Sequence, residues 1–365
     1  MNPDSTILLV GIGGAGVAIA RRVSRAYGDG LRLLLADTDA ASGLPDEPFV
    51  LIGGNRLSGH GSGGDVVAAR MAAEDSLGAF DEALSGVRLA VLVAGLGGGT
   101  GGGATLEAVK HLSDRGIPSI VFATTPFAFE GSDRQRNARG VMAMIADAAN
   151  ATFFQPLDRL VEGTDNMTDA LTEAVDALAA GITLFWRTVH SPGYIRMDAE
   201  RLRHVISTAG KGRFASFSLQ GPNRAKEALR LITESPRLLT GSGPVQSILC
   251  GILAGDDLRL SEVGTIADGV RQAFGNTCHF DLATVNDEGT FGGRLSVVVM
   301  LFESNAHEDT PAEGDPGGKP KHAASVLGAG TTNRRGRFNN AEHTIWNGED
   351  LDIPTFIRKH ITLEF

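Results

Sequence analysis

A run of glycines at residues 95–103 constrains what this chain can fold into more than any other stretch. Seven of these nine residues are glycine, and they follow an apolar segment, 89–94, that is typical of a buried strand. The next segment, 105–112, has the apolar spacing of a helix. Glycine lets backbone N–H groups approach an anion closely, and a helix N-terminus favours negative charge. We therefore expect a phosphate-binding loop here; the alternative is a tight strand-to-helix turn that binds nothing.

The composition is that of a soluble globular protein and argues against some partners. At 365 residues the chain is long enough for two domains and a tail. The formal net charge of −10 argues against a general nucleic-acid binder or a binder of anionic membranes. The two cysteines, Cys250 and Cys278, provide neither a disulfide framework nor a metal-binding spacing, which favours a reducing cytoplasm. We expect no signal peptide, no direct membrane insertion and no metal site.

A second glycine-rich segment lies close to the N-terminus. Residues 6–10 form an apolar run that predicts a buried strand, and residues 11–16 then match the pattern G-x-G-x-x-G ahead of a predicted helix. Another predicted strand, 31–36, ends at Asp37, where a Rossmann enzyme carries its ribose-binding acid. This pattern keeps open an NAD-dependent oxidoreductase, which would bind NAD and form no filaments.

The two glycine-rich segments together differ from a Rossmann half-domain, which has one. The sequence also has no Gly-Lys-Ser or Gly-Lys-Thr ending of an ordinary P-loop. Residues 97–103, GGGTGGG, resemble the GGGTGTG signature of the tubulin and FtsZ superfamily, with Gly102 in place of the second Thr. Other segments resemble FtsZ in the same order: its first glycine loop at 11–16, its ANTDA segment at 36–40, its GAGGN loop at 59–65, and its PFxFEGxxR segment at 125–134.

This resemblance is near-collinear from residue 6 to residue 302, and the chain is identified as a divergent member of the FtsZ family. The resemblance implies an α/β fold with a Rossmann-like GTPase domain built on a parallel sheet, a long central helix and an α+β C-terminal activation domain. Apolar residues at helical spacing from Thr168 to Val189 predict the central helix independently, with Asn166 or Thr168 as its N-cap. The implied boundaries are 1–164 for the nucleotide-binding domain, 165–190 for the central helix, 191–302 for the activation domain, 303–341 for a disordered linker and 342–365 for a partner-binding peptide.

The resemblance implies that GTP or GDP, with Mg²⁺, binds at the glycine loops. Backbone donors would surround the phosphates, and Thr100 would add a hydroxyl. Glu130 and Arg134 would lie near the ribose and base; the simpler alternative is a surface ion pair at i, i+4, worth a few tenths of a kcal/mol. The implied nucleotide-binding residues are Gly13, Gly14, Gly16, Asp39, Gly63, Gly64, Gly97, Gly98, Gly99, Thr100, Gly101, Gly102, Glu130 and Arg134.

The sequence departs from the FtsZ pattern in the residues that would recognise guanine. Leu157 and Val175 stand where FtsZ has polar residues that read the base, and Leu171 replaces the stacking aromatic. Ala18 replaces an Asn of the first loop. Apolar side chains cannot hydrogen-bond the edge of guanine, and unpaired polar edges discriminate strongly. We expect phosphate binding to be retained and guanine specificity to be weakened.

A segment at 191–202 resembles the FtsZ loop PGxINxDFADV, whose two Asp residues reach into the nucleotide site of the neighbouring subunit. Asp198 matches the first Asp, whereas Arg201 stands at the second and Glu200 lies one residue earlier. The resemblance therefore implies catalytic roles for Asp198 and Glu200 at the γ-phosphate. Asp198 would also suit a helix N-cap, and Arg201 would be able to contact phosphate.

The C-terminal tail has its own signal. Residues 303–341 are polar and show little apolar periodicity, which is typical of a disordered linker. Residues 351–358 resemble the FtsZ C-terminal peptide LDIPAFLR, which implies binding to a membrane-tether or regulator protein. The alternative is packing of the terminus against its own domain. The implied partner-binding residues are Asp352, Ile353, Pro354, Phe356, Ile357 and Arg358.

These features together predict an FtsZ-like protein of the bacterial cytoplasm, at the division site. It would form head-to-tail filaments with itself and hydrolyse GTP at the interface between subunits. Leu157, Val175 and Arg201 favour a first alternative, a structural filament or ring modulator that does not hydrolyse nucleotide. The NAD-dependent oxidoreductase is the second alternative.

Overall fold

The computed structural model of the chain describes residues 6–28, 30–161, 166–197, 199–241, 243–275, 277–303, 345–346 and 349–350. Contacts divide the chain into two units, Met1–Glu308 and Asp309–Phe365. In the second unit, β11 (Ile345–Trp346) pairs antiparallel with β12 (Glu349–Asp350). The six residues of the predicted partner-binding peptide lie outside the described residues: Asp352, Ile353, Pro354, Phe356, Ile357 and Arg358.

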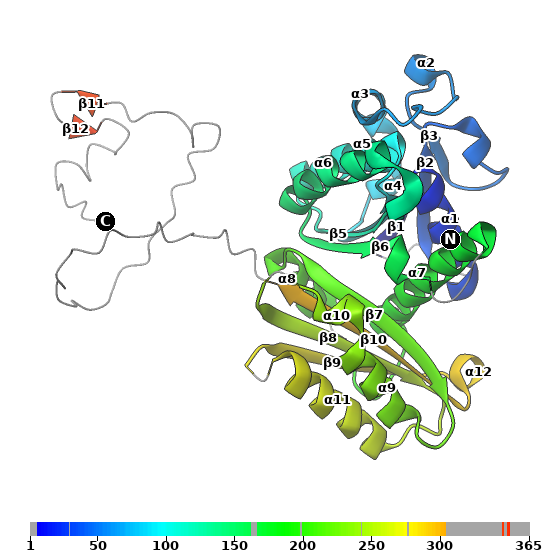
Figure 1. The fold of residues 1–365 in the computed structure, drawn as a ribbon, viewed down its shortest axis with the longest axis vertical. Coiled ribbons are helices and arrows are strands. Elements are labelled where there is room, and N and C mark those ends of the chain that lie inside the picture. The colour runs from blue at the N-terminus through cyan, green and yellow to red at the C-terminus, as the bar shows by residue number, and fades with distance from the viewer. Residues whose placement is uncertain are drawn as a thin grey trace. The chain divides into compact units, whose positions relative to one another are not determined.

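Six strands between residues 7 and 156 form a parallel sheet in the order β3-β2-β1-β4-β5-β6 (Figure 1). Each neighbouring pair is parallel. The central strands are continuous apolar runs because helices cover both of their faces. The strands are β1 (Ile7–Ile12), β2 (Arg32–Asp37), β3 (Phe49–Leu51), β4 (Leu89–Gly95), β5 (Ser119–Thr125) and β6 (Ala151–Pro156).

Alternate residues of β1 enter two different cores. Ile7 and Leu9 pack in the cluster that contains apolar residues of α1 and α7. Leu8 and Val10 pack in the cluster that contains residues of α5 and α6. This alternation follows from the two-residue period of a strand. The helices around this sheet are α1 (Gly13–Tyr27), α2 (Gly54–Leu57), α3 (Val66–Glu74), α4 (Asp81–Leu84), α5 (Gly99–Asp114), α6 (Ser132–Ala148) and α7 (Met167–His190).

The central helix α7 joins the two sheets through one core. Its N-cap is Asn166, whose Oδ1 accepts hydrogen bonds from the backbone N–H groups of Thr168 and Asp169. Ile182 and Phe185 are fully buried in a cluster that holds residues of both sheets. The long apolar helix expected from the sequence is confirmed, and Asn166 rather than Thr168 caps it.

The described residues after α7 form a four-stranded sheet in the order β7-β10-β8-β9 (Figure 1). β10 is antiparallel to both β7 and β8, whereas β8 and β9 are parallel. One face packs on α7 and the other on α9 and α11. The elements are α8 (Ala199–Thr208), β7 (Gly212–Gln220), α9 (Arg224–Glu234), α10 (Pro236–Leu239), β8 (Val245–Ala254), α11 (Leu260–Phe274), β9 (His279–Asn286), α12 (Glu288–Phe291) and β10 (Arg294–Glu303).

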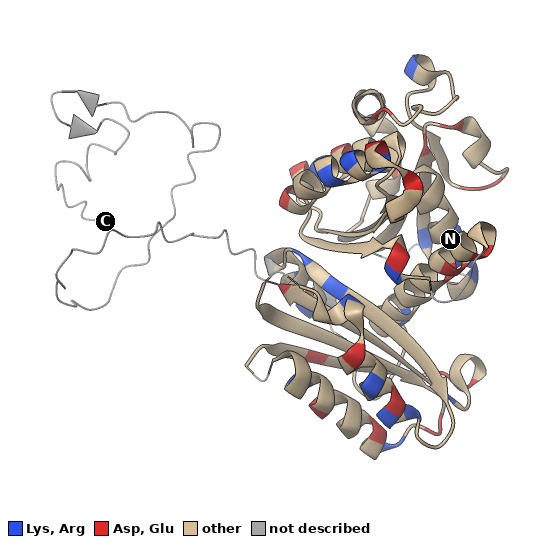
Figure 2. Cartoon of the chain, viewed as in Figure 1, with Lys and Arg blue, Asp and Glu red and all other residues tan. Residues whose placement is uncertain are grey.

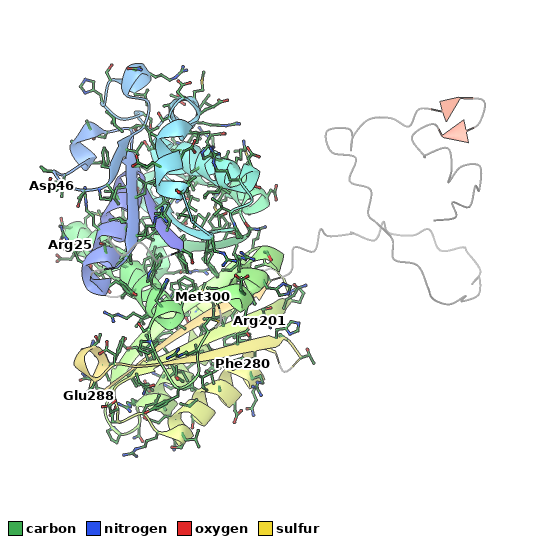
Figure 3. All side chains as sticks on the ribbon, turned by 180° about the vertical axis from the view of Figure 1, so that it is seen from behind. Arg25, Asp46, Arg201, Phe280, Glu288 and Met300 are labelled. Carbon is green, nitrogen blue, oxygen red and sulfur yellow. The ribbon has the colours of Figure 1, made fainter. Side chains whose placement is uncertain are left out.

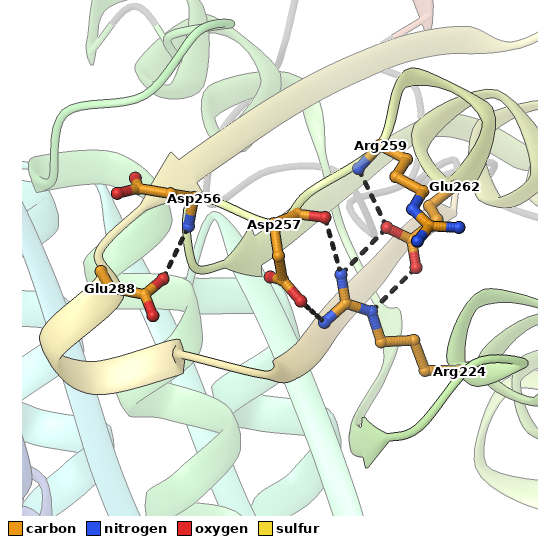
Figure 4. Close-up of polar contacts among 6 residues, drawn as sticks. All are labelled: Arg224, Asp256, Asp257, Arg259, Glu262 and Glu288. Carbon is orange, nitrogen blue, oxygen red and sulfur yellow. Dashed lines mark hydrogen bonds and ion pairs between the residues drawn. The ribbon is translucent and has the colours of Figure 1, made fainter.

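A buried arginine ties the loop between β8 and α11 to α9 (Figure 4). The side chain of Arg224 is 5% exposed, and it donates to Glu262 at 2.8 and 3.0 Å and to Asp257 at 2.7 Å. These hydrogen bonds from Arg224 hold the pKa of Glu262 below its ordinary value. Most other charged side chains lie on helices and loops, and the parallel sheet carries few (Figure 2). No helix of the described residues is long and apolar enough to cross a membrane.

Candidate functional site

Two glycine-rich helix starts meet at one edge of the parallel sheet. α1 begins at Gly13, directly after β1, and α5 begins at Gly99, four residues after the end of β4. β1 and β4 are neighbours at the point where the chain order of the sheet reverses, and ligands of open α/β sheets bind outside the carboxyl ends of strands at such a point. A Cβ atom added to Gly13 would lie 3.0 Å from the backbone nitrogen of Gly101, so the two helix starts are in contact. The edge therefore presents two sets of helix N–H groups to one small volume.

The glycine run forms part of α5 rather than a loop ahead of it. The sequence predicts a helix at 105–112, but the structure begins the helix at Gly99. A Cβ atom at Gly101 would overlap the carbonyl oxygen of Gly95, and one at Gly103 would overlap that of Val66. Glycine is a poor helix former, but here close packing against the neighbouring backbone outweighs its propensity.

Two glycines at this edge are not explained by packing. A Cβ atom at Gly98 would meet no described atom within 4 Å, and one at Gly14 would meet only Asp37 Oδ2, at 4.0 Å. Gly98 has φ −91° and ψ 173°, which other residues adopt readily. The space in front of both helices is therefore open to a ligand, and a phosphate group there would contact the main chain of each helix.

The loop of residues 59–65 closes a third side. Gly61, Gly63 and Gly64 have φ values of 77°, 60° and 83°, which lie in the left-handed region that favours glycine. Asn137 of α6 donates to the carbonyl oxygen of Gly64 at 2.9 Å. A Cβ atom at Gly99 would overlap Ser62 Oγ, so this loop contacts the start of α5. The structure thus brings the three predicted glycine segments together.

The hydroxyl of Thr100 hydrogen-bonds to its own protein. Its Oγ1 lies 2.6 Å from Thr38 Oγ1 and 3.3 Å from Ser62 Oγ, and the residue is buried. These bonds join the end of β2 and the third loop to α5. Asp39 caps the turn that follows it, because its Oδ1 accepts from the N–H of Ala41 at 2.9 Å. The phosphate contact predicted for the Thr100 hydroxyl would have to share these existing bonds.

The carboxylate of Asp37 is used inside the protein. The residue is 4% exposed, its Oδ2 accepts from Ser42 Oγ at 2.6 Å, and its Oδ1 accepts from the N–H of Thr38 at 2.7 Å. An NAD-dependent enzyme would need this carboxylate for the ribose hydroxyls. Asp37 stands where a Rossmann enzyme has its ribose-binding acid, but here its carboxylate orders the loop after β2.

Glu130 and Arg134 form the ion pair that the sequence offered as the simpler alternative. Arg134 Nη1 lies 2.6 Å from Glu130 Oε2, and Glu130 Oε1 accepts from the N–H of Phe127 at 2.8 Å. Arg134 is nevertheless placed beside the glycine run, since a Cβ atom at Gly97 would lie 3.5 Å from its Cβ. Its side chain is 61% exposed and leaves donors free for an anion at the rim.

An apolar hollow lies next to this rim and was not predicted from the sequence. Its volume is about 280 Å³, and its lining includes Phe127, Phe129 and Met167. The rings of Phe127 and Phe129 stack with centroids 5.0 Å apart, and Phe129 is largely exposed. Two phenylalanines flanking one alanine in the 125–134 segment were the available signal. An exposed aromatic beside a cavity is typical of a contact surface.

The predicted catalytic segment lies at the other end of the molecule's parallel sheet. Asp198 itself lies outside the described residues. Glu200, on α8, pairs with Arg88 at 2.5 Å and with Arg203 at 2.8 Å. Arg88 immediately precedes β4, whereas the glycine run follows the far end of that strand. Sequence reasoning missed Arg88 because its partner is more than a hundred residues away.

Arg201 is also engaged within the protein. Its Nε lies 3.0 Å from Asp281 Oδ1 on β9. Figure 3 labels Arg201 close to Phe280, the residue before Asp281 on that strand. The loop before α8 is anchored to the same strand, because Thr284 N–H donates to the carbonyl oxygen of Ile195 at 2.8 Å. A Cβ atom at Gly193 would overlap the carbonyl oxygen of Thr284, so only glycine allows this approach. Residues 193–195 are therefore held against β9.

Residues 6–165 match the family model for the Tubulin/FtsZ family, GTPase domain. This match covers the part of the chain that forms the parallel sheet and the helices α1 to α6 around it. The predicted resemblance to this superfamily is thereby confirmed, and a guanine nucleotide is the ligand class that the family implies. The α/β fold predicted from the sequence is likewise confirmed.

Solved structures share the fold of the parallel sheet and of the four-stranded sheet that follows it. An empty FtsZ dimer from M. jannaschii is 22% identical, with a TM-score of 0.76 over 81% of this chain and 87% of that one. The GTPγS-bound protofilament of CetZ2 from Haloferax volcanii is 24% identical, with a TM-score of 0.67 over 82% and 94%. TubZ of Clostridium botulinum phage c-st is 13% identical, with a TM-score of 0.58 over 83% and 93%. At these identities the likeness concerns the fold.

Proposed function

We propose that this chain binds GTP at the glycine-rich edge of its parallel sheet and hydrolyses it between two copies stacked head to tail. The observation that carries the proposal is a distance: the length of β4 separates the glycine run from the predicted catalytic segment at the start of α8. Glu200 is held next to Arg88, before β4 begins, and the glycine run starts where β4 ends. Seven residues of strand span about 23 Å at roughly 3.3 Å each.

That distance is too long for one copy to complete its own site. Asp198 and Glu200 would meet a bound phosphate only if a second copy stacked its α8 end on the glycine edge of the first. Such a contact joins two different surfaces, so it repeats and produces an open filament. Relatives are consistent with this arrangement, since CetZ2 was solved as a GTPγS-bound protofilament and FtsZ as a dimer.

The residues have distinct roles in this proposal. The N–H groups at the starts of α1 and α5 hold the phosphates, and Arg134 supplies a positive charge at the rim. Asp198 of the next copy orients the attacking water. Mg²⁺ would rely chiefly on the phosphates, because the described residues contain no group of three His, Cys, Asp or Glu that could hold a metal ion.

A filament that does not hydrolyse nucleotide is the second candidate, and two observations favour it. Glu200 is shared by two arginines, and Arg201 is paired with Asp281. A neighbouring phosphate or its bound water would have to share the Glu200 carboxylate with two arginines, and Arg201 with Asp281. In addition Leu157 and Val175 leave the base without polar partners at those positions, so the proposed site discriminates guanine from adenine weakly.

The proposed setting is the bacterial division site, in the cytoplasm. Its support is the resemblance of residues 351–358 to the peptide by which FtsZ binds membrane tethers and regulators. The chain itself would stay off the membrane, and the partner of this peptide would attach the filament.

Phosphate release from GTP, measured over a range of protein concentrations with ATP in parallel, tests this function. We expect turnover per chain to be negligible when the chain is dilute and to rise above a threshold concentration, because the site needs two copies. We expect ATP to be used as well, within about tenfold of GTP, because the residues that the resemblance places at the base, Leu157 and Val175, are apolar. Turnover per chain that is equal at all concentrations would contradict the shared site. Assembly without any phosphate release would favour the second candidate.

A further inference from the structure

A second cavity, separate from the glycine edge, opens at the amino ends of β4 and β5. Its volume is about 630 Å³, within the usual range for small-molecule sites. It is lined by the residues just before each strand and by one face of α8. The length of β4 separates it from the glycine run of the same copy, and Glu200, at its edge, belongs to the α8 end proposed to approach a second copy.

Three arginines from three different elements line this cavity. Arg88 precedes β4, Arg115 follows α5, and Arg203 lies on α8. His204 lies beside them, and Glu200 is the acidic residue among the described lining residues. Positive charge therefore gathers here in a chain whose formal net charge is −10. A cavity with arginine walls concentrates anions.

Ion pairs hold these guanidinium groups in place without using all their donors. Arg88 and Arg203 each use Nη2 on one oxygen of Glu200, at 2.5 and 2.8 Å. Arg115 uses Nη2 on Asp81 Oδ1, at 2.6 Å, and Nη1 on His111 Nδ1, at 2.9 Å. Each guanidinium has five N–H donors in a planar fork, which matches the oxygens of a phosphate. Because the side chains are already ordered, binding an anion costs less conformational entropy.

One side of the cavity is apolar. Val87, Ile117 and Pro118 line it between Arg88 and Arg115. An inorganic anion would leave this wall exposed to water, whereas an organic group attached to a phosphate would cover it. The combination of a cationic wall and an apolar wall suits a small phosphorylated organic molecule.

We propose that this cavity is a second binding site for a small phosphate monoester with an apolar or aromatic body. The cavity shares no residue with the glycine edge, and it contains Glu200 of the proposed catalytic segment, which is not among the residues proposed to bind the monoester. Arg88, Arg115 and Arg203 bind the phosphate, and Ile117 and its neighbours contact the organic group.

Calorimetric titration of the full chain with phenyl phosphate tests this site, with GDP present at saturation so that the glycine edge is occupied. We expect one additional molecule to bind per chain, at least tenfold more tightly than inorganic phosphate. Arg115→Ala and Arg203→Ala should each weaken this binding at least tenfold. The control Arg230→Ala, which removes an exposed arginine of α9 that also pairs with two acids, should leave it unchanged.

A further variant separates loss of binding from loss of folding. Ile117→Ser removes apolar contact but no charge, so it should lower the affinity for phenyl phosphate and leave that for inorganic phosphate unchanged. Any of three results would overturn the proposal. They are the absence of an additional binding event, equal affinity for phenyl phosphate in the wild-type chain and the arginine variants, and equal affinity of the wild-type chain for phenyl phosphate and inorganic phosphate. If GDP failed to bind, a phosphate event lost only in the Arg115 and Arg203 variants would still identify this cavity.

Discussion

The Gly98→Asp variant is expected to fold normally and to lose nucleotide binding. Gly98 is the N-cap of α5, its backbone is extended, and a Cβ atom there meets no described atom within 4 Å. Asp is among the best N-cap residues, and its charge is favourable at a helix N-terminus, so the free energy of unfolding should stay equal or rise slightly. A phosphate at the same place would be repelled. Two like charges about 4 Å apart at an effective dielectric constant near 20 repel by about 4 kcal/mol, which corresponds to roughly a thousandfold weaker binding.

Gly98→Asn is the matched control for this variant, because it has nearly the same shape and no charge. It should fold equally well and bind GTP or GDP much more tightly than Gly98→Asp does. Equilibrium binding of a fluorescent GDP analogue, together with thermal unfolding, measures both quantities. Equal nucleotide affinity in the wild-type chain and in Gly98→Asp would show that the phosphates bind elsewhere.

The Arg224→Met variant is expected to lose more stability than removal of any surface arginine. Arg224 is buried and holds Asp257 and Glu262, so the substitution leaves two carboxylates without their cation. Breaking a buried pair by removing one partner costs about 3–5 kcal/mol. We therefore expect the free energy of unfolding of this variant to fall by about this amount.

Arg230→Met is the control, because Arg230 lies on the same helix and pairs with Glu227 and Glu234 at the surface. Exposed pairs of this kind contribute about 0–1 kcal/mol. Urea unfolding of both variants at one protein concentration gives the comparison. Similar losses in the two variants would mean that the Arg224 network contributes no more than a surface pair.

The meeting of the glycine segments at one edge of the sheet could be predicted from the sequence because it depends on local patterns. Apolar runs followed by glycines mark the carboxyl ends of β1 and β4, and such ends meet at one edge when the strands are parallel neighbours. The α7 helix could be predicted in the same way, since its Asn166 cap and the spacing of its apolar residues are local signals.

The start of α5 could not be predicted in this way. Helix propensity argues against Gly99, Gly101 and Gly103. Only the approach of the backbones of Asp65, Gly95 and Val66 explains why glycine is needed there. That approach is a property of the tertiary fold. The β9 strand was also missed, because only its residues 283–285 are buried and its first half carries a histidine and an aspartate.

The ion pairs made by Glu200 and Arg201 could not be predicted from the sequence either. Arg88 and Glu200 are adjacent only after β4 and α8 are assembled, and Arg201 finds Asp281 on a strand that the sequence did not reveal. Long-range ion pairs leave no periodic trace in a single sequence. This is why the role of Glu200 rests on the proposal that a second copy approaches it.

A mixing experiment tests the shared site most directly. Gly98→Asp keeps Asp198 but does not bind nucleotide, and Asp198→Asn keeps the glycine loops but lacks the proposed catalytic carboxylate. Each variant alone should release little or no phosphate from GTP. In an equal mixture, random stacking pairs an intact loop with an intact Asp198 at about one junction in four, so about a quarter of wild-type turnover should return. If the two variants sediment together and the mixture stays inactive, the site is not shared between copies.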